Sequence, residues 1–417
     1  MHNKLFWLIP LSLWLAACTQ VQEMTLPNGL RVIVKEDHRS PVVVSQVWYK
    51  IGSQDEPQGL TGISHVLEHM MFKGTALHGP NEFSRIIAEN GGRENAFTSY
   101  DYTSYFQQLE KSRLPVSFEL EADRMHNLIL ADEEFRKEIK VVMEERRLRT
   151  EDQPEALVGE KFMATAYVAH NYKNPVIGWM PDLEKMTVED VRTWYRRWYT
   201  PDNAILVVVG DVKPDEVFAL AKKYFGPVPS RPLDKTVTAS EPKQDKGRRT
   251  HVAAPAEVPY LVLGYHTPVH ASVGKGGDAP EWEPYALTVL AGVLDGGQAS
   301  RFERELVREK KIAASADVDY SAVSRSPNLL AIDGTPANGH NIGELEQAIH
   351  AQIERIKAEP VSIEELKRVN AVTAEQVQAV ARKYLVDSNL TVAVLDPLPI
   401  DKAKRRRAPR MGGGDVR

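Results

Sequence analysis

Hydrophobic residues are concentrated in short runs just after the N-terminal segment. Residues 30–34 and 42–49 are rich in β-branched and aromatic side chains, and Asn28 and Gly29 mark a turn before the first run. This composition between turn signals is typical of strands, so both runs are predicted to be strands. Residues 95–106, which are polar and aromatic, are expected to form a further strand.

Other segments place hydrophobic positions at helical spacing. Residues 61–72 are predicted to form a helix with Ser64 as its candidate N-cap, and residues 132–147 a second helix with Asp132 as N-cap. A third helix is expected over residues 187–199. The apolar stripes of the first two helices comprise Val66, Leu67, Met70, Met71, Phe135, Ile139, Val142 and Met143.

The pattern of the first half of the chain recurs in the second half. Residues 373–394 align without gaps on residues 187–208, and residues 260–265 resemble the strand at 42–49. This indicates an internal duplication into two related α/β halves. The second half is shorter by roughly thirty residues, with an apparent break near Val369.

Length and composition fit two globular domains, and the duplicated halves give the expected class as α/β (α+β). The chain has 417 residues, of which 42% are hydrophobic and 26% charged. Its net charge of −5 supplies no basic surface for nucleic acid, so no nucleic-acid partner is expected. The predicted organisation is a signal peptide (1–17), an N-terminal half (22–226), a Pro- and Lys-rich linker (227–257), a C-terminal half (258–397) and a basic tail (398–417).

The N-terminal segment has the features of a bacterial lipoprotein signal. Residues 5–15 are apolar, too short a run to remain as a helix across a bilayer core of about 30 Å. Residues 15–18 resemble the lipoprotein signal box, and Cys18 is the only cysteine. Cys18 is therefore expected to be the lipidated mature N-terminus of an envelope protein on the periplasmic side of the outer membrane. An ordinary signal peptide with an incidental cysteine is the alternative.

The helix predicted over residues 61–72 carries the motif His-x-x-Glu-His. His65 and His69 are four positions apart, so their rings lie on one helical face, about one turn apart, and can bind one Zn²⁺. Glu68 lies between them and can reach a water bound to the metal. The motif is the inverted form of the commoner zinc-peptidase helix. The alternative is an exposed helix with two unrelated histidines.

Two histidines and one water leave zinc short of its usual four ligands, so a further ligand is required. The helix predicted over residues 132–147 holds Glu138 and Glu145, two turns apart on one face. Glu145 is a candidate third protein ligand, and Glu138 a candidate carboxylate that orients a histidine or the water. Each glutamate of this charged helix could instead belong to a solvated face.

The His-x-x-Glu-His motif, followed some seventy-five residues later by a Glu-x6-Glu pair, resembles the pitrilysin/insulinase family of zinc metallopeptidases, in particular its processing-peptidase branch. The resemblance continues through residues 26–32, 91–98 and 202–204. It implies a fold of two related halves, each a mainly antiparallel sheet with packed helices, closing like a clam shell around a cleft. It also implies these roles: zinc ligands His65, His69 and Glu145, general base Glu68, supporting residue Glu138, and substrate-binding residues Asn95 and Ala96.

The second half departs from the family pattern. Active single-chain members carry an Arg and, seven residues on, a Tyr that bind substrate; here Arg308 matches the Arg, but Ser315 occupies the Tyr position. Tyr320 is nearby in sequence. The resemblance therefore implies a zinc-bearing subunit that works on peptides in a homo- or heterodimer, with a paralogous partner supplying the Arg and Tyr. A zinc-bearing scaffold without catalysis and a peptide-binding lipoprotein are the alternatives.

Overall fold

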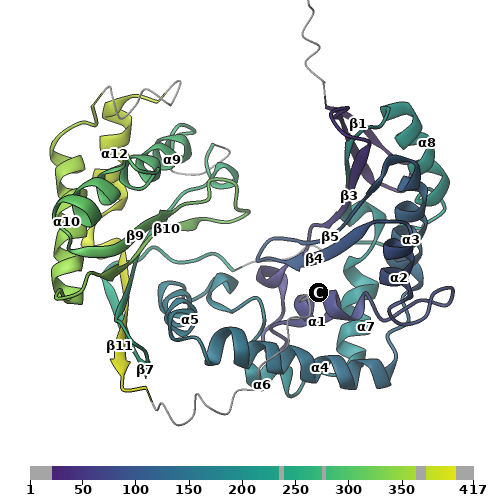
Figure 1. Cartoon of the computed structure of the whole chain (residues 1–417), viewed down its shortest axis with the longest axis horizontal. Coiled ribbons are helices and arrows are strands. Elements are labelled where there is room, and N and C mark those ends of the chain that lie inside the picture. The colour runs from purple at the N-terminus through teal and green to yellow at the C-terminus, as the bar shows by residue number, and fades with distance from the viewer. Residues whose placement is uncertain (1–20, 234–238, 275–278, 363–371, 401–417) are drawn as a thin grey trace, which may run out of the picture.

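The computed structural model describes residues 21–233, 239–274, 279–362 and 372–400. The signal segment with Cys18, the apparent break near Val369 and most of the basic tail lie outside these residues. Within the described ranges, no helix is long and apolar enough to cross a membrane. The chain forms two lobes that face each other across an open space (Figure 1).

The first lobe contains a six-stranded sheet with the strand order β1-β2-β6-β3-β5-β4. Only the β2–β6 pairing is parallel among the pairings of this sheet in the described residues. The predicted strands over residues 30–34 and 42–49 are confirmed as β2 and β3. The strands span Gln22–Thr25 (β1), Arg31–Glu36 (β2), Val42–Tyr49 (β3), Arg93–Thr98 (β4), Thr103–Glu110 (β5) and Ala204–Gly210 (β6).

The second lobe repeats this arrangement with the strand order β7-β11-β8-β10-β9. Strand β7 pairs parallel with β11, as β2 pairs with β6, and β8 is antiparallel to β11, as β3 is to β6. The duplication predicted from the sequence is therefore present in the sheet topology. The strands span Arg248–Pro255 (β7), Tyr260–Thr267 (β8), Ala313–Asp319 (β9), Asn328–Pro336 (β10) and Leu390–Leu398 (β11).

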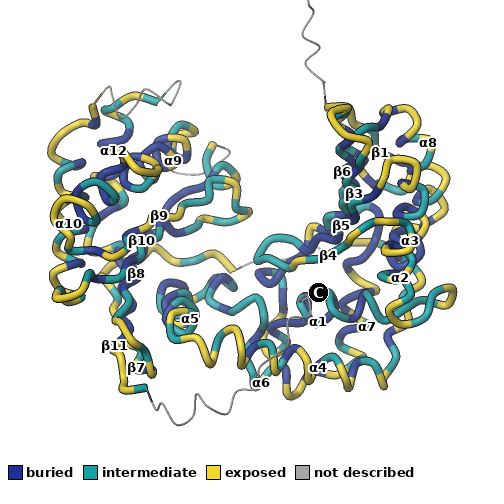
Figure 2. The backbone as a smooth tube through the Cα atoms, in the orientation of Figure 1, coloured by how far each residue is buried: buried dark blue, intermediate teal, exposed yellow. Residues whose placement is uncertain are grey.

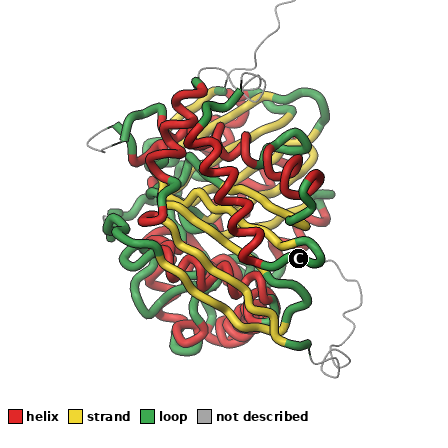
Figure 3. Tube along the Cα trace, turned by 90° about the vertical axis from the view of Figure 1, so that its left-hand side faces the viewer, coloured by secondary structure: helices red, strands yellow, loops and turns green. Residues whose placement is uncertain are grey.

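Helices cover the sheets, and the helix preceding the last strand of each half begins with the same capping box. The Thr187 and Thr373 side chains each accept a hydrogen bond from the third helical N–H. Seen from the side of the second lobe, helices lie in front of its strands (Figure 3). The α-helices span Ile63–Met70 (α1), Glu82–Glu89 (α2), Leu114–Asn127 (α3), Asp132–Arg146 (α4), Pro154–Ala166 (α5), Met180–Leu183 (α6), Val188–Trp198 (α7), Pro214–Tyr224 (α8), Glu283–Leu294 (α9), Ile342–Ala358 (α10) and Ala374–Tyr384 (α12).

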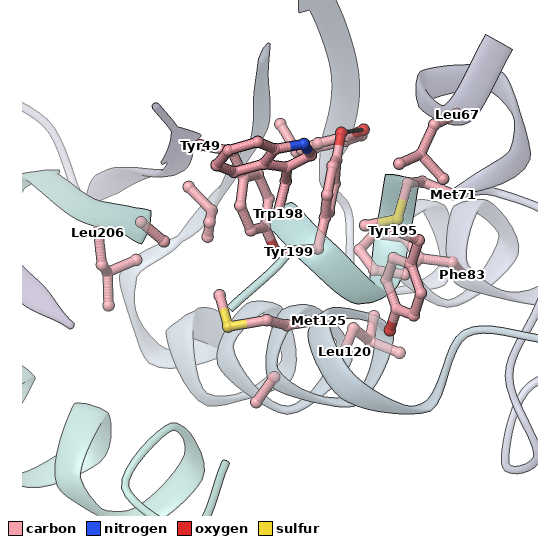
Figure 4. Packing of buried hydrophobic residues seen from close by; sticks show 14 of the residues in the cluster. Tyr49, Leu67, Met71, Phe83, Leu120, Met125, Tyr195, Trp198, Tyr199 and Leu206 are labelled. Carbon is pink, nitrogen blue, oxygen red and sulfur yellow. Dashed lines mark hydrogen bonds between the residues drawn. The ribbon is translucent and has the colours of Figure 1, made fainter. Parts of the chain in front are cut away.

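Each lobe has its own hydrophobic core. In the first lobe, buried positions alternate with less buried ones along β3 and β6, whereas β8 and residues 390–395 of β11 in the second lobe are buried almost continuously. Figure 2 shows this burial along the central strands. In the first lobe, Tyr49 stacks on Tyr199 with ring centroids 4.1 Å apart, and Figure 4 shows this pair beside Trp198 and Met125. A third cluster joins the lobes: α5 packs on β7, β8 and β11 through residues such as Phe162 and Tyr167.

Two expectations from the sequence are corrected. The stretch 95–106 is not one strand but the antiparallel hairpin of β4 and β5, in which Thr98 pairs with Thr103 around a tight turn. The expected linker 227–257 contains β7, because Arg248–Pro255 pairs along its length with β11. Its charges and its proline fit a strand at the edge of a sheet, where side chains and one row of backbone groups face solvent.

Candidate metal centre

The N-cap of helix α1 is Gly62 and not Ser64, which lies inside the first turn, so the expected N-cap is corrected. Gly62 has φ +86°, and a Cβ there would lie 2.6 Å from the carbonyl oxygen of Ile177, so only glycine fits without strain. The buried carboxylate of Glu56 accepts hydrogen bonds from the backbone N–H groups of Gly62 (2.7 Å) and Ser64 (2.8 Å). Glu56 therefore satisfies two free donors at the start of the helix.

Helix α4 packs against α1 and brings a second set of side chains to it. It starts at Asp132 with Ala131 at the N-cap position, so Asp132 lies inside the first turn and is not the N-cap. Phe135, Ile139 and Val142 are buried on one face, as their helical spacing predicts. The sequence could not show which glutamates of α4 face α1, because that depends on how the two helices pack.

His65, His69 and Glu145 form the only group of three or more candidate ligands among the described residues, with ligand atoms within 4.8 Å of one another. Glu145 Oε2 lies 3.3 Å from His69 Nε2 and 3.8 Å from His65 Nε2. Tetrahedral ligands bound to zinc at about 2.0–2.1 Å lie about 3.3 Å apart, so this donor set fits the metal. The residues predicted as ligands are thus brought together, and their metal-binding role remains a prediction.

Glu138 lies beside the other nitrogen of His69. Its Oε2 is 3.3 Å from His69 Nδ1, and its Oε1 accepts a salt bridge from Lys73 Nζ at 2.6 Å. A carboxylate on the far nitrogen fixes the orientation of an imidazole whose other nitrogen faces a metal. Glu138 thus lies where it could orient His69, and its supporting role stays a prediction. Lys73, which no pattern in the sequence identified, pairs with it.

The two histidines sit in different electrostatic environments. Burial lowers the pKa of His65 to about 4, so its ring is neutral, as a metal ligand must be. Burial also opposes the charge of His69, but the adjacent carboxylates of Glu138 and Glu145 outweigh it and raise its pKa to about 9.

Glu68 projects next to this group from the same helix. Burial raises the pKa of its carboxyl, and Thr98 Oγ1 donates a 2.5 Å hydrogen bond to its Oε2. Thr98 is the last residue of β4, so this short hydrogen bond connects helix α1, which carries Glu68, to the edge strand of the first sheet. No local pattern in the sequence identifies Thr98 as a partner of Glu68, because the contact joins residues thirty positions apart.

A cavity of about 1270 Å³ opens beside the metal group and is lined by both lobes. Asn95 and Ala96 of edge strand β4 line it, and their role in substrate binding stays a prediction. The second lobe contributes Tyr260, Val262, Asp319, Ala331 and Asp333. The cavity reaches the metal group through His65, Glu68, His69 and Glu145.

Arg308 is not among the residues that line this cavity within the described ranges. Arg308 lies in a π-helical segment, Phe302–Glu309, and its side chain is half-exposed. Its guanidinium Nη2 donates a hydrogen bond to the carbonyl oxygen of Gln298. Ser315 is on β9, and the Tyr320 hydroxyl donates to the carbonyl oxygen of Pro268 at 2.6 Å. This arrangement does not support substrate binding by Arg308 from within the same chain, and that role stays a prediction.

Comparison with known proteins places the chain in a family. Residues 31–179 match the model of the insulinase family, peptidase family M16, and residues 185–371 match that of the M16 inactive domain. Zinc protease PqqE of Helicobacter pylori is 34% identical over 386 residues, covering 88% of this chain and 84% of that protein. Zinc protease YmxG of Bacillus subtilis, described as uncharacterized, is 27% identical, covering 83% and 81%.

Solved structures agree with this placement. The crystal structure of a protease from Helicobacter pylori superposes with a TM-score of 0.85 and 29% identity, covering 91% of this chain and all of that one. The first half of the periplasmic protease PqqL from Escherichia coli shares the fold, with a TM-score of 0.65 at 18% identity, covering 95% and 98%. The resemblance inferred from the His-x-x-Glu-His motif is confirmed. This chain belongs to peptidase family M16.

Proposed function

We propose that this chain is a zinc-dependent endopeptidase that hydrolyses extended polypeptides. The observation that carries the proposal is the convergence of His65, His69 and Glu145 beside the buried carboxylate of Glu68, on the wall of a large cavity. A structural zinc site needs no such carboxylate, so the position of Glu68 favours catalysis over a scaffold role. Zinc is the metal that the names of the relatives specify.

His65, His69 and Glu145 would hold the metal, with Glu138 orienting His69. When bound, zinc supplies a Lewis acid that polarises the scissile carbonyl and makes a neutral-pH nucleophile of water. Glu68 accepts a proton from the attacking water and returns it to the leaving amine. Burial raises the pKa of Glu68 and so moves this carboxyl towards the range in which a group can both take up and release a proton.

Strand β4 supplies the binding surface for the polypeptide. It is the edge strand of its sheet and lines the cavity through Asn95 and Ala96. A substrate added as a further strand would be recognised mainly through its backbone, so an extended chain of varied sequence can bind. Thr98, at the end of this strand, then positions Glu68 next to the bound backbone.

The cellular setting is part of the proposal. The signal box ending at Cys18 supports a lipid-anchored protein on the periplasmic side of the outer membrane. Arg308 is not among the described residues that line the cavity, and Ser315 stands in place of the usual Tyr. Both features support a homo- or heterodimer in which a paralogous partner completes substrate binding. One zinc per chain is expected, because the described residues hold one ligand group.

The test is hydrolysis of a quenched fluorogenic peptide by the purified mature chain, with and without a chelator, zinc re-addition and a paralogous partner. Chelator-sensitive turnover restored by zinc supports the peptidase. Full activity of the chain alone would refute the need for a partner. Stoichiometric zinc without turnover under any of these conditions would show that the chain is a scaffold.

A further inference from the structure

The loop between β9 and β10 carries an arginine that crosses to the first lobe. Arg325 Nη1 and Nη2 donate to the two carboxylate oxygens of Asp55 at 2.8 and 3.1 Å, in a paired, fork-like geometry. The same residue donates through its backbone N–H to Asp101 Oδ2 at 2.9 Å, and through Nη1 to the Asp101 carbonyl at 3.1 Å. One residue of the second lobe thus binds two residues of the first, Asp55 through its side chain and Asp101 through both its backbone and its side chain.

Asp55 depends on this contact. Its side chain is fully buried, and burial raises the pKa of its carboxyl while Arg325 opposes that shift. A buried carboxylate that loses the cation paired with it is strongly destabilised, because its charge is then left uncompensated. Asp101 is held from other sides as well, since Gln54 Nε2 and the Tyr172 hydroxyl donate to its Oδ1 at 2.6 and 2.7 Å.

Asp55 lies in a short 3-10 turn, Ser53–Asp55, that contacts both helix α1 and the turn that follows β4. The backbone N–H groups of Ser53 and Gln54 donate to the carbonyl oxygens of Ser99 and Tyr100, in the turn that follows β4. The next residue along the chain, Glu56, caps the first turn of α1. The turn therefore connects the strand that carries Thr98 with the helix that carries Glu68.

We propose that Arg325 is a positioning residue for the active site, an inference that rests on the proposed peptidase function. By binding Asp55 and Asp101 it holds the turn Ser53–Asp55 between α1 and β4, and so maintains the contact of Thr98 with Glu68. The second lobe contributes to catalysis in this way although it provides no metal ligand among the described residues.

Arg325 is not the sole contact between the lobes in the described residues. The apolar cluster of α5 against β7, β8 and β11 joins them independently, through Phe162, Tyr167 and Ala393 among others. Replacing Arg325 therefore changes the geometry near Glu68 while the two lobes remain packed. Because the apolar cluster and the Arg325 contact are independent, the positioning role of Arg325 can be tested in the full chain.

The test compares Arg325→Gln with the matched control Arg249→Gln. Arg249 makes an equally paired contact with Glu346, at 2.8 and 2.8 Å, but entirely within the second lobe. Arg325→Gln should lower kcat about tenfold to a hundredfold, with KM changed less than about threefold and zinc content unchanged. Arg325→Lys should recover part of the loss, and the control variant should match the wild type.

Hydrogen exchange gives a second measurement that does not depend on activity. In Arg325→Gln the amides of residues 52–64 and 99–102 should exchange faster, whereas those of α10 and α12 should be unchanged. Unchanged kcat in an active wild-type background, or unchanged exchange in these segments, overturns the positioning role. A wild type without chelator-sensitive hydrolysis would instead refute the peptidase, and the exchange measurement would still decide whether Arg325 holds the turn.

Discussion

Replacement of Glu68 by glutamine tests the proposed chemistry most directly. Glutamine has nearly the same shape, and its side-chain oxygen can still accept the hydrogen bond from Thr98 Oγ1 that the glutamate accepts at 2.5 Å. The amide cannot take up a proton at neutral pH, so only the transfer step is removed. The metal ligands His65, His69 and Glu145 are untouched, and zinc should stay at one per chain.

The size of the effect follows from the position of Glu68. A well-placed general base contributes about 10²–10⁴-fold to a rate, which is about 3–5 kcal/mol of barrier at 1.36 kcal/mol per tenfold. The carboxyl is largely buried and beside the ligand group, so bulk water cannot replace it efficiently. The loss should therefore appear in kcat and leave KM nearly unchanged.

The assay is cleavage of a quenched fluorogenic peptide, with zinc measured on the same samples by elemental analysis. Glu133→Gln is the control, because Glu133 lies on α4 with an exposed side chain that pairs with Lys137. The control should retain wild-type turnover and zinc. If Glu68→Gln keeps more than about a tenth of the wild-type kcat, Glu68 is not the general base. If the variant loses its zinc, the effect is on the metal site instead.

Three further predictions concern the metal, acid and the backbone. Glu145→Gln should lose zinc on dialysis, whereas Glu138→Gln should keep it with about 10–100-fold weaker affinity in a chelator competition. Burial alone would raise the pKa of Glu305, but Arg355 and its neighbours hold it at about 2. The resulting stabilisation, about 3 kcal/mol, is complete above pH 4.5 and is lost as pH falls towards 2. Urea unfolding of Glu305→Gln should therefore show less loss of stability between pH 5 and 3 than the wild type. Gly62→Ala should lower stability by about 2 kcal/mol or more in thermal unfolding, because φ is +86° and a backbone oxygen lies 2.6 Å from the added Cβ.

The sequence alone determined the features that depend on short stretches of chain. His65 and His69 share one face because four positions make about one helical turn, whatever surrounds the helix. The duplication was equally accessible, because Thr187 and Thr373 begin the same ungapped run of capped helix and strand. The family resemblance followed from such local motifs.

Only the tertiary structure decided which distant groups meet. Helix α4 is rich in glutamate, and its packing on α1 places Glu145 between the two histidines and Glu138 behind one of them. The sequence of β7 predicts a linker, because it contains arginine, histidine and proline. This segment is a strand because it pairs in parallel with β11 at the edge of the sheet. Local spacing determines geometry over about one or two helical turns, whereas pairing and packing depend on where each element lies in the fold. Thr98 and Arg325 act across such long separations, and no local pattern marks them.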